Sequence, residues 1–470
     1  MNSLRNTLLV AAAISGLCSL EASAQEKGVA VWLTTADRSS LFAEQSKHLA
    51  IMKGGPNVGE IITINPAQRF QQMQGFGYAL TGGSAELLMK MSPPARAKLL
   101  KELFGNGANG IGVSYLRVSV GASDMNSKVF TYDDMPPEQT DATLAHFSLG
   151  PDLDDVVPVL QEILAIDPKI TILASPWSAP SWMKSNDKPK GGSLKPEWYG
   201  AYAQYFVRYL QAMAAKGIRV NALTIQNEPL NPKNTPSMVM TSPEEGAFLA
   251  DALGPALRKA GLQTDVILYD HNCDEPGYPL DILANANAAQ YAKGSGFHLY
   301  GGSIDAMTKV HDAYPKKDLY FTEQMTTQER PGPLLIAEPT SRLMVGAPRN
   351  WSRNVLLWNL AADPHDGPHT GDGGCPVCQG AMTLDGDTVT RNLAFYTVAH
   401  SSMFVRPGSV RVASTEDTAL PNVAYVTPDR RTVLVVANPG TAAHDFRVVE
   451  GGRSFTAALA PGDVATYVWK

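Results

Sequence analysis

The amino-acid sequence predicts an α/β protein, a (β/α)8 TIM barrel with an attached β-sandwich domain formed by both chain ends. Eight short β-branched or aromatic runs recur through the middle of the chain, and a longer amphipathic or loop segment follows each of them. Alternating strands and helices are typical of a parallel sheet, and eight such units over roughly 300 residues suit a closed barrel with insertions. Near both ends, strand-like runs lack helices between them, which is typical of a sandwich.

The expected barrel strands cover residues 73–78, 113–120, 170–175, 222–226, 266–270, 296–300, 319–322 and 354–359. Helices are expected over 92–104, which Ser92 and two prolines begin, and over 198–215. A further helix is expected to begin at Ser242, which is spaced with Glu245 as a capping box. The alternative is an open doubly wound sheet, which often has a glycine-rich phosphate loop after its first strand. Only a fragment of such a loop stands at 75–77.

The two ends of the chain are expected to pair in one domain. Strands without a following helix are predicted at 29–34 and 61–64, and again at 409–413, 424–427, 432–437, 444–449 and 464–469. The predicted division is therefore a signal peptide at 1–24, N-terminal sandwich strands at 25–73, the barrel at 74–384 and the C-terminal sandwich at 385–470.

The N-terminus has the pattern of a cleavable signal peptide. Arg5 precedes an apolar run over 8–20, and the small residues at 22–24 then place the first mature residue at Gln25. A membrane anchor is the alternative, but the run is shorter than the about 20 residues that a spanning helix needs. A lipid anchor on Cys18 would follow Leu17, which is a poor neighbour for that modification. We expect a secreted or periplasmic protein.

Composition and charge exclude some partners. The chain has 470 residues, of which 44% are hydrophobic and 18% charged, with a net charge of −6. These values are ordinary for a soluble globular protein with a sizeable core. Lysines and arginines form no run of the kind that tracks phosphates, so we expect no nucleic-acid partner. We also expect no stable membrane insertion, and a monomer.

Three cysteines remain after the predicted cleavage, namely Cys273, Cys375 and Cys378. Cys375 and Cys378 are expected to form a disulfide in an oxidising compartment or to stay as thiols. The alternative is a zinc site with His365 and His369, but their close spacing in a loop rich in Gly and Pro differs from that of a zinc finger. A Cys–His nucleophile pair is also conceivable where His271 and Cys273 follow the fifth strand.

Two glutamates follow predicted strands that lie roughly opposite each other across the barrel. Glu228 follows the fourth strand in the segment Gln-Asn-Glu-Pro at 226–229, and Glu323 ends the seventh. A single glutamate after a strand is usually a solvated loop residue or a helix cap. Active sites of such barrels lie at the C-terminal ends of the strands, however, and a carboxyl pair flanking one bond is what glycoside cleavage requires. We predict Glu228 and Glu323 as catalytic residues.

Other strand ends carry side chains that suit a sugar site. Aromatic faces stack on sugar rings, and Arg, Asn and His bind hydroxyls in a concave site. Each aromatic residue alone could equally be packing in the core. Arg117 could also serve mainly to keep Glu323 ionised, because a nearby cation favours a carboxylate. The predicted substrate-binding residues are Arg117, Asp124, Trp177, Asn227, His298, Tyr300 and Trp358.

The sequence resembles glycoside hydrolase family 30, the family of glucosylceramidases and endo-β-1,6-glucanases. The similar blocks, in family order, are Gln-Gly-Phe-Gly at 74–77, 174–184 around Trp177, Gln-Asn-Glu-Pro at 226–229, His-Leu-Tyr at 298–300 and Phe-Thr-Glu-Gln at 321–324. The resemblance covers nearly all of the mature chain. It implies the barrel with its sandwich, retention of anomeric configuration, Glu228 as acid/base and Glu323 as nucleophile.

The resemblance leaves the substrate open. Segments 351–364 and 373–375 look like bacterial members, several of which cut β-1,6-glucan, so we expect an endo-β-1,6-glucanase. Met325 stands where some glucosylceramidases have a cysteine, which argues against ceramide substrates. The alternatives are a glucosylceramidase, another β-glucosidase or a β-xylosidase of the same family, and, in another class, a non-catalytic carbohydrate-binding protein.

The expected chemistry is a two-step cleavage that needs no metal or organic cofactor. Retaining enzymes hold their carboxyl groups about 5–5.5 Å apart, and inverting enzymes about 6.5–9.5 Å. An acid/base residue works with a raised pKa while its partner stays ionised. We therefore expect a raised pKa for Glu228 and an ionised Glu323.

Overall fold

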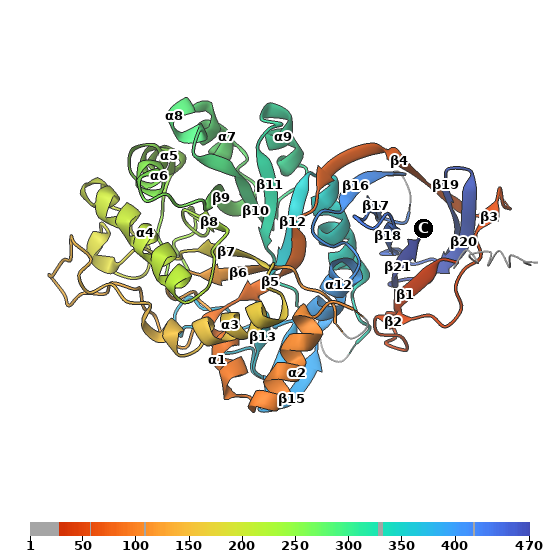
Figure 1. The fold of residues 1–470 in the computed structure, drawn as a ribbon, viewed down its shortest axis with the longest axis horizontal. Helices are drawn as coiled ribbons and strands as arrows, with labels where there is room; N and C mark the ends of the chain where they lie inside the picture. Colours follow the sequence, from red (N-terminus) through yellow and green to blue (C-terminus); the bar gives the residue numbers. More distant parts are fainter. Residues whose placement is uncertain (1–27, 57, 108–109, 328–331, 417–418) are drawn as a thin grey trace, which may run out of the picture.

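The structure is a computed structural model, and it describes residues 28–56, 58–107, 110–327, 332–416 and 419–470. The predicted signal peptide lies outside the described residues. Two domains lie side by side, with the barrel on the left of Figure 1 and the sandwich on the right. The first and last strands of the described chain both lie in the sandwich (Figure 1).

Eight strands form a closed parallel barrel, in which the last pairs with the first. Each of the eight predicted runs overlaps one of these strands, in the same order, so the barrel prediction is confirmed. The strands are β5 (Gly75–Leu80), β6 (Tyr115–Ser119), β7 (Thr171–Ser175), β8 (Ala222–Thr224), β9 (Asp265–Cys273), β10 (Ala292–Gly302), β11 (Asp318–Glu323) and β12 (Ser352–Leu357).

Close packing explains the glycine at the start of the first barrel strand. Gly75 has φ 147°, and a Cβ atom there would lie 2.5 Å from Ser114 Oγ. The glycine is thus needed where the chain passes close to its neighbour, rather than for a phosphate loop. Above it, side chains from six of the strands fill the barrel as one buried cluster, made of Tyr115, Leu173, Ala222, Ile267, Tyr320 and Leu356.

Helices surround the barrel (Figure 1). They are α1 (Gly82–Lys90), α2 (Pro93–Phe104), α3 (Val156–Ile166), α4 (Tyr199–Ala215), α5 (Ser242–Phe248), α6 (Gly254–Lys259), α7 (Gly277–Ala284), α8 (Ala286–Ala289), α9 (Ala306–Ala313), α10 (Ala337–Pro339), α11 (Gly346–Arg349) and α12 (Leu393–Ser402). The helices predicted over 92–104 and 198–215 are confirmed as α2 and α4.

The capping box predicted for the third helix was wrong by one residue. Thr241 is the N-cap of α5, and its backbone N–H donates to Glu244 at 2.7 Å. Glu245 is fully buried and accepts instead from the backbone N–H of Tyr269 and the hydroxyl of Tyr278. Because Glu245 has tertiary partners, the cap falls to the residue before it.

The sandwich contains strands from both ends of the chain, as predicted. β1 (Ala30–Thr34) pairs with β21 (Val464–Trp469), and the long β4 (Glu60–Gln72) pairs with both β16 (Val410–Ser414) and β19 (His444–Glu450). The sheet order is β2-β1-β21-β18-β17-β16-β4-β19-β20-β3. Its other strands are β2 (Ala43–Glu44), β3 (Met52–Lys53), β17 (Asn422–Val426), β18 (Thr432–Ala437) and β20 (Arg453–Leu459).

A small third sheet was not predicted. It consists of β13 (Ala361–Ala362), β14 (Met382–Asp385) and β15 (Thr388–Arg391). The predicted domain boundary at 384 stays a prediction. β15 and α12 follow it, and the next sandwich strand begins at Val410.

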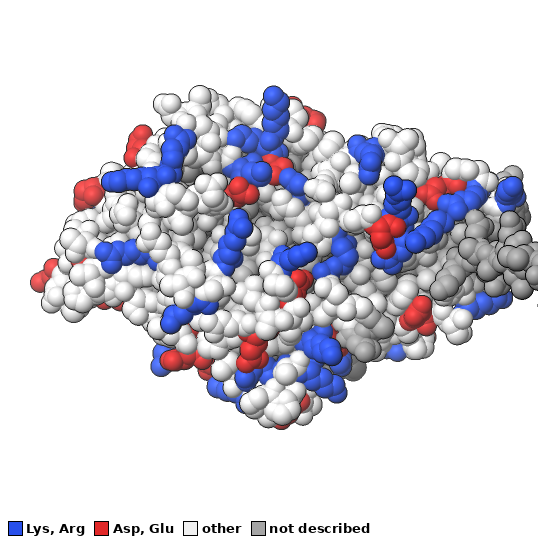
Figure 2. All heavy atoms as spheres, viewed as in Figure 1, with Lys and Arg blue, Asp and Glu red and all other residues white. Residues whose placement is uncertain are grey.

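The distribution of surface charge and the hydropathy of the helices bear on the expected partners. On the face drawn in Figure 2, acidic and basic side chains are interspersed over both domains rather than gathered into one basic track. Within the part of the chain that the structure describes, no helix combines the length and the apolar character that crossing a membrane requires.

Candidate active site

The two predicted catalytic glutamates lie at the C-terminal ends of the barrel strands. Glu228 follows β8 and Glu323 is the last residue of β11, and both are more than nine-tenths buried. Both line an open cleft of about 420 Å³. Glu228 has φ 44°, a left-handed conformation that costs on the order of 1–3 kcal/mol for such a residue and that clusters at functional sites. Its backbone N–H donates to the carbonyl of Asp270 at 3.0 Å, which helps to hold this turn.

Arg117, on β6, lies beneath the cleft and is fully buried. Its Nη1 donates to Glu323 Oε2 at 2.5 Å, and its Nη2 donates to Asn227 Oδ1 at 2.6 Å and to Asp270 Oδ2 at 2.8 Å. Nε donates to Ser175 at 3.1 Å. Arg117 is not among the residues that line the cleft. Arg117 therefore holds the carboxylates in place. Its position does not favour a direct contact with a sugar.

His298, on β10, joins the two glutamates. Its Nδ1 lies 3.0 Å from Glu228 Oε1 and 3.8 Å from Glu323 Oε1, and its Nε2 lies 3.1 Å from Asp270 Oδ1. The sum of the first two distances is an upper bound on the separation of the two Oε1 atoms. This bound applies to one pair of oxygens, and it allows the about 5–5.5 Å separation of retaining enzymes.

The pKa of Glu228 is shifted against the expectation, and the pKa of Glu323 is raised above its usual value. Burial alone would raise the pKa of Glu228, but the hydrogen bond and charge of His298, with a smaller effect of His271, lower it to about 2. Burial raises the pKa of Glu323, although His298 and Arg117 oppose this effect. The expectation of a raised pKa for Glu228 was wrong, because the contact with the imidazole of His298 favours the carboxylate form of Glu228.

The pKa of His298 is shifted upward by the same contacts. Burial would lower the pKa of His298, but the carboxylates of Glu323, Asp270 and Glu228 raise it to about 9. In the hydrogen bond between His298 and Glu228, these shifts favour the proton on the imidazole.

Aromatic side chains form one wall of the site. The rings of Trp177 and Trp358 stack with centroids 5.4 Å apart, and the Arg117 guanidinium lies over both. Trp358 lines the cleft, whereas Trp177 lies behind it and is 2% exposed. Tyr300, which is 39% exposed, donates its hydroxyl to Glu323 Oε1 at 3.0 Å. Both oxygens of Glu323 thus accept a hydrogen bond, one from Tyr300 and one from Arg117.

Asp124 lines the cleft and is 6% exposed. Among the described residues, its Oδ1 has no hydrogen-bond partner. Burial, together with the charges of Glu323 and Glu228, raises the pKa of Asp124 to about 8. A buried polar atom without a partner inside a cleft is a candidate for a ligand contact.

Two residues of the site were not predicted. Asp270 accepts from Arg117, Ser175 and Thr224 through Oδ2 and contacts His298 through Oδ1. Asn231 donates to Glu228 Oε2 at 2.7 Å. Asp270 stands at the end of the fifth predicted strand, and that position was the available signal. Asn231 lies in a loop, and no sequence pattern indicated its role.

The cysteine alternatives resolve in favour of the disulfide. Cys375 and Cys378 are bonded to each other and line the cleft. They are therefore not thiolate ligands, and the zinc site predicted as their alternative is not formed. Cys273 is buried, and burial raises the pKa of its thiol to about 12, which argues against a nucleophilic pair with His271.

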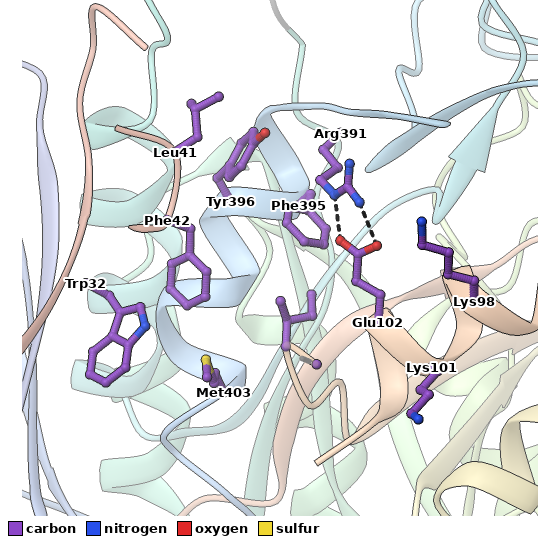
Figure 3. Close-up of a pocket in the computed structure, with 12 residues that line it drawn as sticks. Trp32, Leu41, Phe42, Lys98, Lys101, Glu102, Arg391, Phe395, Tyr396 and Met403 are labelled. Carbon is purple, nitrogen blue, oxygen red and sulfur yellow. Dashed lines mark hydrogen bonds and ion pairs between the residues drawn. The ribbon is translucent and has the colours of Figure 1, made fainter. Parts of the chain in front are cut away.

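A larger cavity lies elsewhere. It has a volume of about 590 Å³ and lies where β1, α2 and α12 meet (Figure 3). Its acidic lining residue, Glu102, is paired through both oxygens with Arg391, at 2.5 and 2.7 Å. Because glycoside cleavage needs two carboxyl groups, the chemistry belongs to the smaller cleft at the barrel mouth.

Comparison with known proteins places the chain in a family. Residues 73–405 match the glycosyl hydrolase family 30 TIM-barrel domain, and residues 408–467 match the family 30 β-sandwich domain. The chain belongs to glycosyl hydrolase family 30. It is a glycoside hydrolase, and the resemblance seen in the sequence is confirmed.

Similar proteins include an endo-1,6-β-D-glucanase of Neurospora crassa, which is 34% identical over 88% of this chain and 89% of its own. The lysosomal acid glucosylceramidase of Mus musculus is 28% identical over 90% of this chain and 85% of its own. Among solved structures, the endo-β1,6-glucanase BT3312 superposes with a TM-score of 0.85 at 34% identity, covering 94% of this chain and 99% of that one. SrfJ from Salmonella typhimurium superposes at 0.88 with 26% identity, covering the same shares.

Proposed function

We propose that this glycoside hydrolase is an endo-β-1,6-glucanase that retains anomeric configuration, with Glu323 as nucleophile and Glu228 as acid/base. The observation that carries the proposal is the position of His298, which contacts Glu228 at 3.0 Å and lies 3.8 Å from Glu323. The similarity to the endo-1,6-β-D-glucanase of Neurospora crassa and to the endo-β1,6-glucanase BT3312 supports the β-1,6-glucan substrate.

In the first step, Glu323 attacks the anomeric carbon and forms a glycosyl–enzyme ester, while the bond to the leaving-group oxygen breaks. Glu228 gives that oxygen a proton. In the second step, Glu228 takes a proton from water, and the water oxygen displaces Glu323 from the anomeric carbon. Arg117 and Tyr300 each hold one oxygen of Glu323, which orients the carboxylate for attack.

The proton that Glu228 delivers comes from its hydrogen bond with His298. Asp270 fixes the imidazole through Nε2, so Nδ1 faces Glu228. As charge leaves Glu323 in the ester, the field that keeps the proton on His298 weakens, and the proton moves along the hydrogen bond to Glu228. His298 is in this view a positioning residue that acts through Glu228.

The sugar before the cleaved bond is proposed to stack on Trp358, with Trp177 supporting that ring from behind. Asp124, whose Oδ1 has no partner among the described residues, is proposed to bind sugar hydroxyls. Asn227 accepts from Arg117 through Oδ1, which leaves its amide group to donate to a hydroxyl near the reacting carbon.

The substrate is tested by product analysis on pustulan, laminarin, gentiobiose and glucosylceramide side by side. We expect gentio-oligosaccharides of mixed length from pustulan and none from laminarin. Release of glucose alone would contradict endo action. Faster cleavage of glucosylceramide than of pustulan would instead favour the glucosylceramidase alternative, for which the murine relative is the support.

The nucleophile is tested with a 2-deoxy-2-fluoro-β-glucoside bearing a good leaving group. Peptide mapping should find the fluoroglucosyl group on Glu323. A label on Glu228, or inversion of configuration in the products, would contradict the assignment.

We also propose that the protein is exported after cleavage before Gln25. The apolar run over 8–20 and the small residues at 22–24 support this proposal. N-terminal sequencing of the protein recovered from periplasm and medium should begin at Gln25, and an intact Met1 would contradict export.

A further inference from the structure

We propose that Glu228, His271 and His298 form a binding site for Zn²⁺ and similar borderline divalent cations, and that a cation bound there blocks hydrolysis. The inhibition of hydrolysis rests on the proposed function, whereas the binding of the cation does not. One ligand atom from each of the three side chains lies within 4.8 Å of the other two, and all three side chains are buried.

The distances suit a small cation. Glu228 Oε1 lies 3.0 Å from His298 Nδ1 and 3.9 Å from His271 Nδ1. Ligand atoms of a tetrahedral zinc site with bonds of about 2.1 Å lie roughly 3.4 Å apart. These two distances lie on both sides of this value, and the ligand atoms of the two histidines lie within 4.8 Å of each other, so side-chain shifts would complete the site.

His271 provides the independent observation. It is 7% exposed, lines the cleft, and its Nδ1 has no hydrogen-bond partner among the described residues. A buried imidazole whose Nδ1 has no hydrogen-bond partner among the described residues, 3.9 Å from a carboxylate, is placed to coordinate a cation.

Two further residues orient the other ligands. Asp270 contacts His298 Nε2 at 3.1 Å, which is the carboxylate–histidine arrangement that fixes the ligating nitrogen in many metal sites. Asn231 donates to Glu228 Oε2 at 2.7 Å and leaves Oε1 directed at the two histidines. The cleft opens to solvent at Glu228 and His271, so an ion can enter.

The ligand set also predicts selectivity. Two imidazoles and one carboxylate suit Zn²⁺ and Cu²⁺, whereas Ca²⁺ and Mg²⁺ prefer oxygen ligands alone. A cation here would displace the proton that lies between His298 Nδ1 and Glu228 Oε1. It would also engage the oxygen of Glu228 that must receive and deliver the proton. Bound metal therefore removes the acid/base and stops turnover, without a part in the reaction itself.

Isothermal titration of ZnCl₂ into the full-length mature protein tests the binding. We expect a site of unit stoichiometry that Ca²⁺ and Mg²⁺ do not occupy. The substitution His271→Asn should weaken Zn²⁺ binding by at least roughly tenfold. The matched control is His365→Asn, which removes an exposed imidazole outside this cluster and should leave the affinity unchanged.

Equal Zn²⁺ affinity in the wild type and in His271→Asn would overturn the proposal, and so would an equal loss in His365→Asn. His271→Gln provides a second variant, and thermal unfolding verifies that each variant is folded.

Activity on pustulan gives the second readout. Zn²⁺ should inhibit the wild type reversibly, with recovery on addition of EDTA, and His271→Asn should need at least roughly tenfold more Zn²⁺ for the same inhibition. If Zn²⁺ binds stoichiometrically at His271 and hydrolysis is undiminished, the proposed inhibition is overturned. A protein that binds Zn²⁺ through His271 but cleaves none of the glucosides would support the site and contradict the proposed function.

Discussion

The barrel mouth and the junction between barrel and sandwich each have a cavity beside a fully buried histidine, and the two histidines differ in charge. His298, at the mouth, contacts carboxylates, which raise its pKa to about 9 against the effect of burial. His400, on α12, contacts the hydroxyls of Thr34 at 2.8 Å and Thr466 at 2.9 Å. Burial lowers the pKa of His400 to about 3.

The difference teaches that burial alone does not make a histidine functional. Burial penalises the imidazolium in both places, but only the carboxylates of Glu228, Asp270 and Glu323 compensate for it. At the barrel mouth, His298 keeps its charge and an exchangeable proton beside a cleft that admits substrate. At the junction, neutral hydrogen bonds join β1, α12 and β21, so His400 connects the two domains.

The largest effect is expected for Glu323→Gln. Without a nucleophile, kcat on gentio-oligosaccharides should fall by on the order of 10⁴-fold or more, because an amide cannot form the glycosyl ester. The matched control is Glu197→Gln, which alters an exposed glutamate on the outside of the barrel and should keep full activity. Full activity in Glu323→Gln would overturn the nucleophile assignment.

His298→Asn should lower kcat by roughly 100-fold while KM changes much less, since Glu228 loses the group that aims it and holds its proton. Steady-state kinetics on pustulan separates the two constants. An increase in KM with unchanged kcat would mean that His298 only binds substrate. That outcome would remove the functional difference between the two histidines.

His400 should make the protein acid-sensitive. Its folded-state pKa is about 3, whereas a histidine in an unfolded chain has a pKa of about 6.5. Above pH 6.5 both states are neutral, and this contribution to stability is fully present. As the pH falls from 6.5 toward 3, only the unfolded chain takes up a proton, so stability is lost at up to about 1.4 kcal/mol per pH unit.

Denaturant unfolding of the wild type and of His400→Gln at pH 7 and pH 4 measures this contribution. The variant should lose less stability between the two pH values than the wild type does. His365→Gln, which changes an exposed histidine, should behave as the wild type. Equal losses in His400→Gln and the wild type would show that His400 is not the acid-sensitive group.

The smallest effect is expected at the junction cavity of Figure 3. Glu102→Gln breaks a partly exposed ion pair with Arg391, and such pairs contribute about 0–1 kcal/mol. The free energy of unfolding should fall within that range, and kcat on pustulan should not change. A loss of activity would show that this cavity takes part in catalysis and would break the distinction between the two regions.

Much of the fold was readable in the sequence because its signals are local. Each barrel strand is a short apolar run, and a parallel barrel buries such runs on both faces, so the pattern gives the strands and their order. The β13–β15 sheet lacks this signal, since its three strands have two, four and four residues. The cap of α5 was also misplaced, because a tertiary contact to Tyr269 occupies Glu245.

The sequence by itself determined which strands carry Glu228 and Glu323, and the family resemblance gave their expected roles. Only the tertiary structure decided how these groups interact. Asp270 and His298 come from different strands and meet only when β9 and β10 pair, and the contact with His298 lowers the pKa of Glu228 against the expectation. Charge interactions depend on distance in space, which the spacing of residues along the chain does not encode.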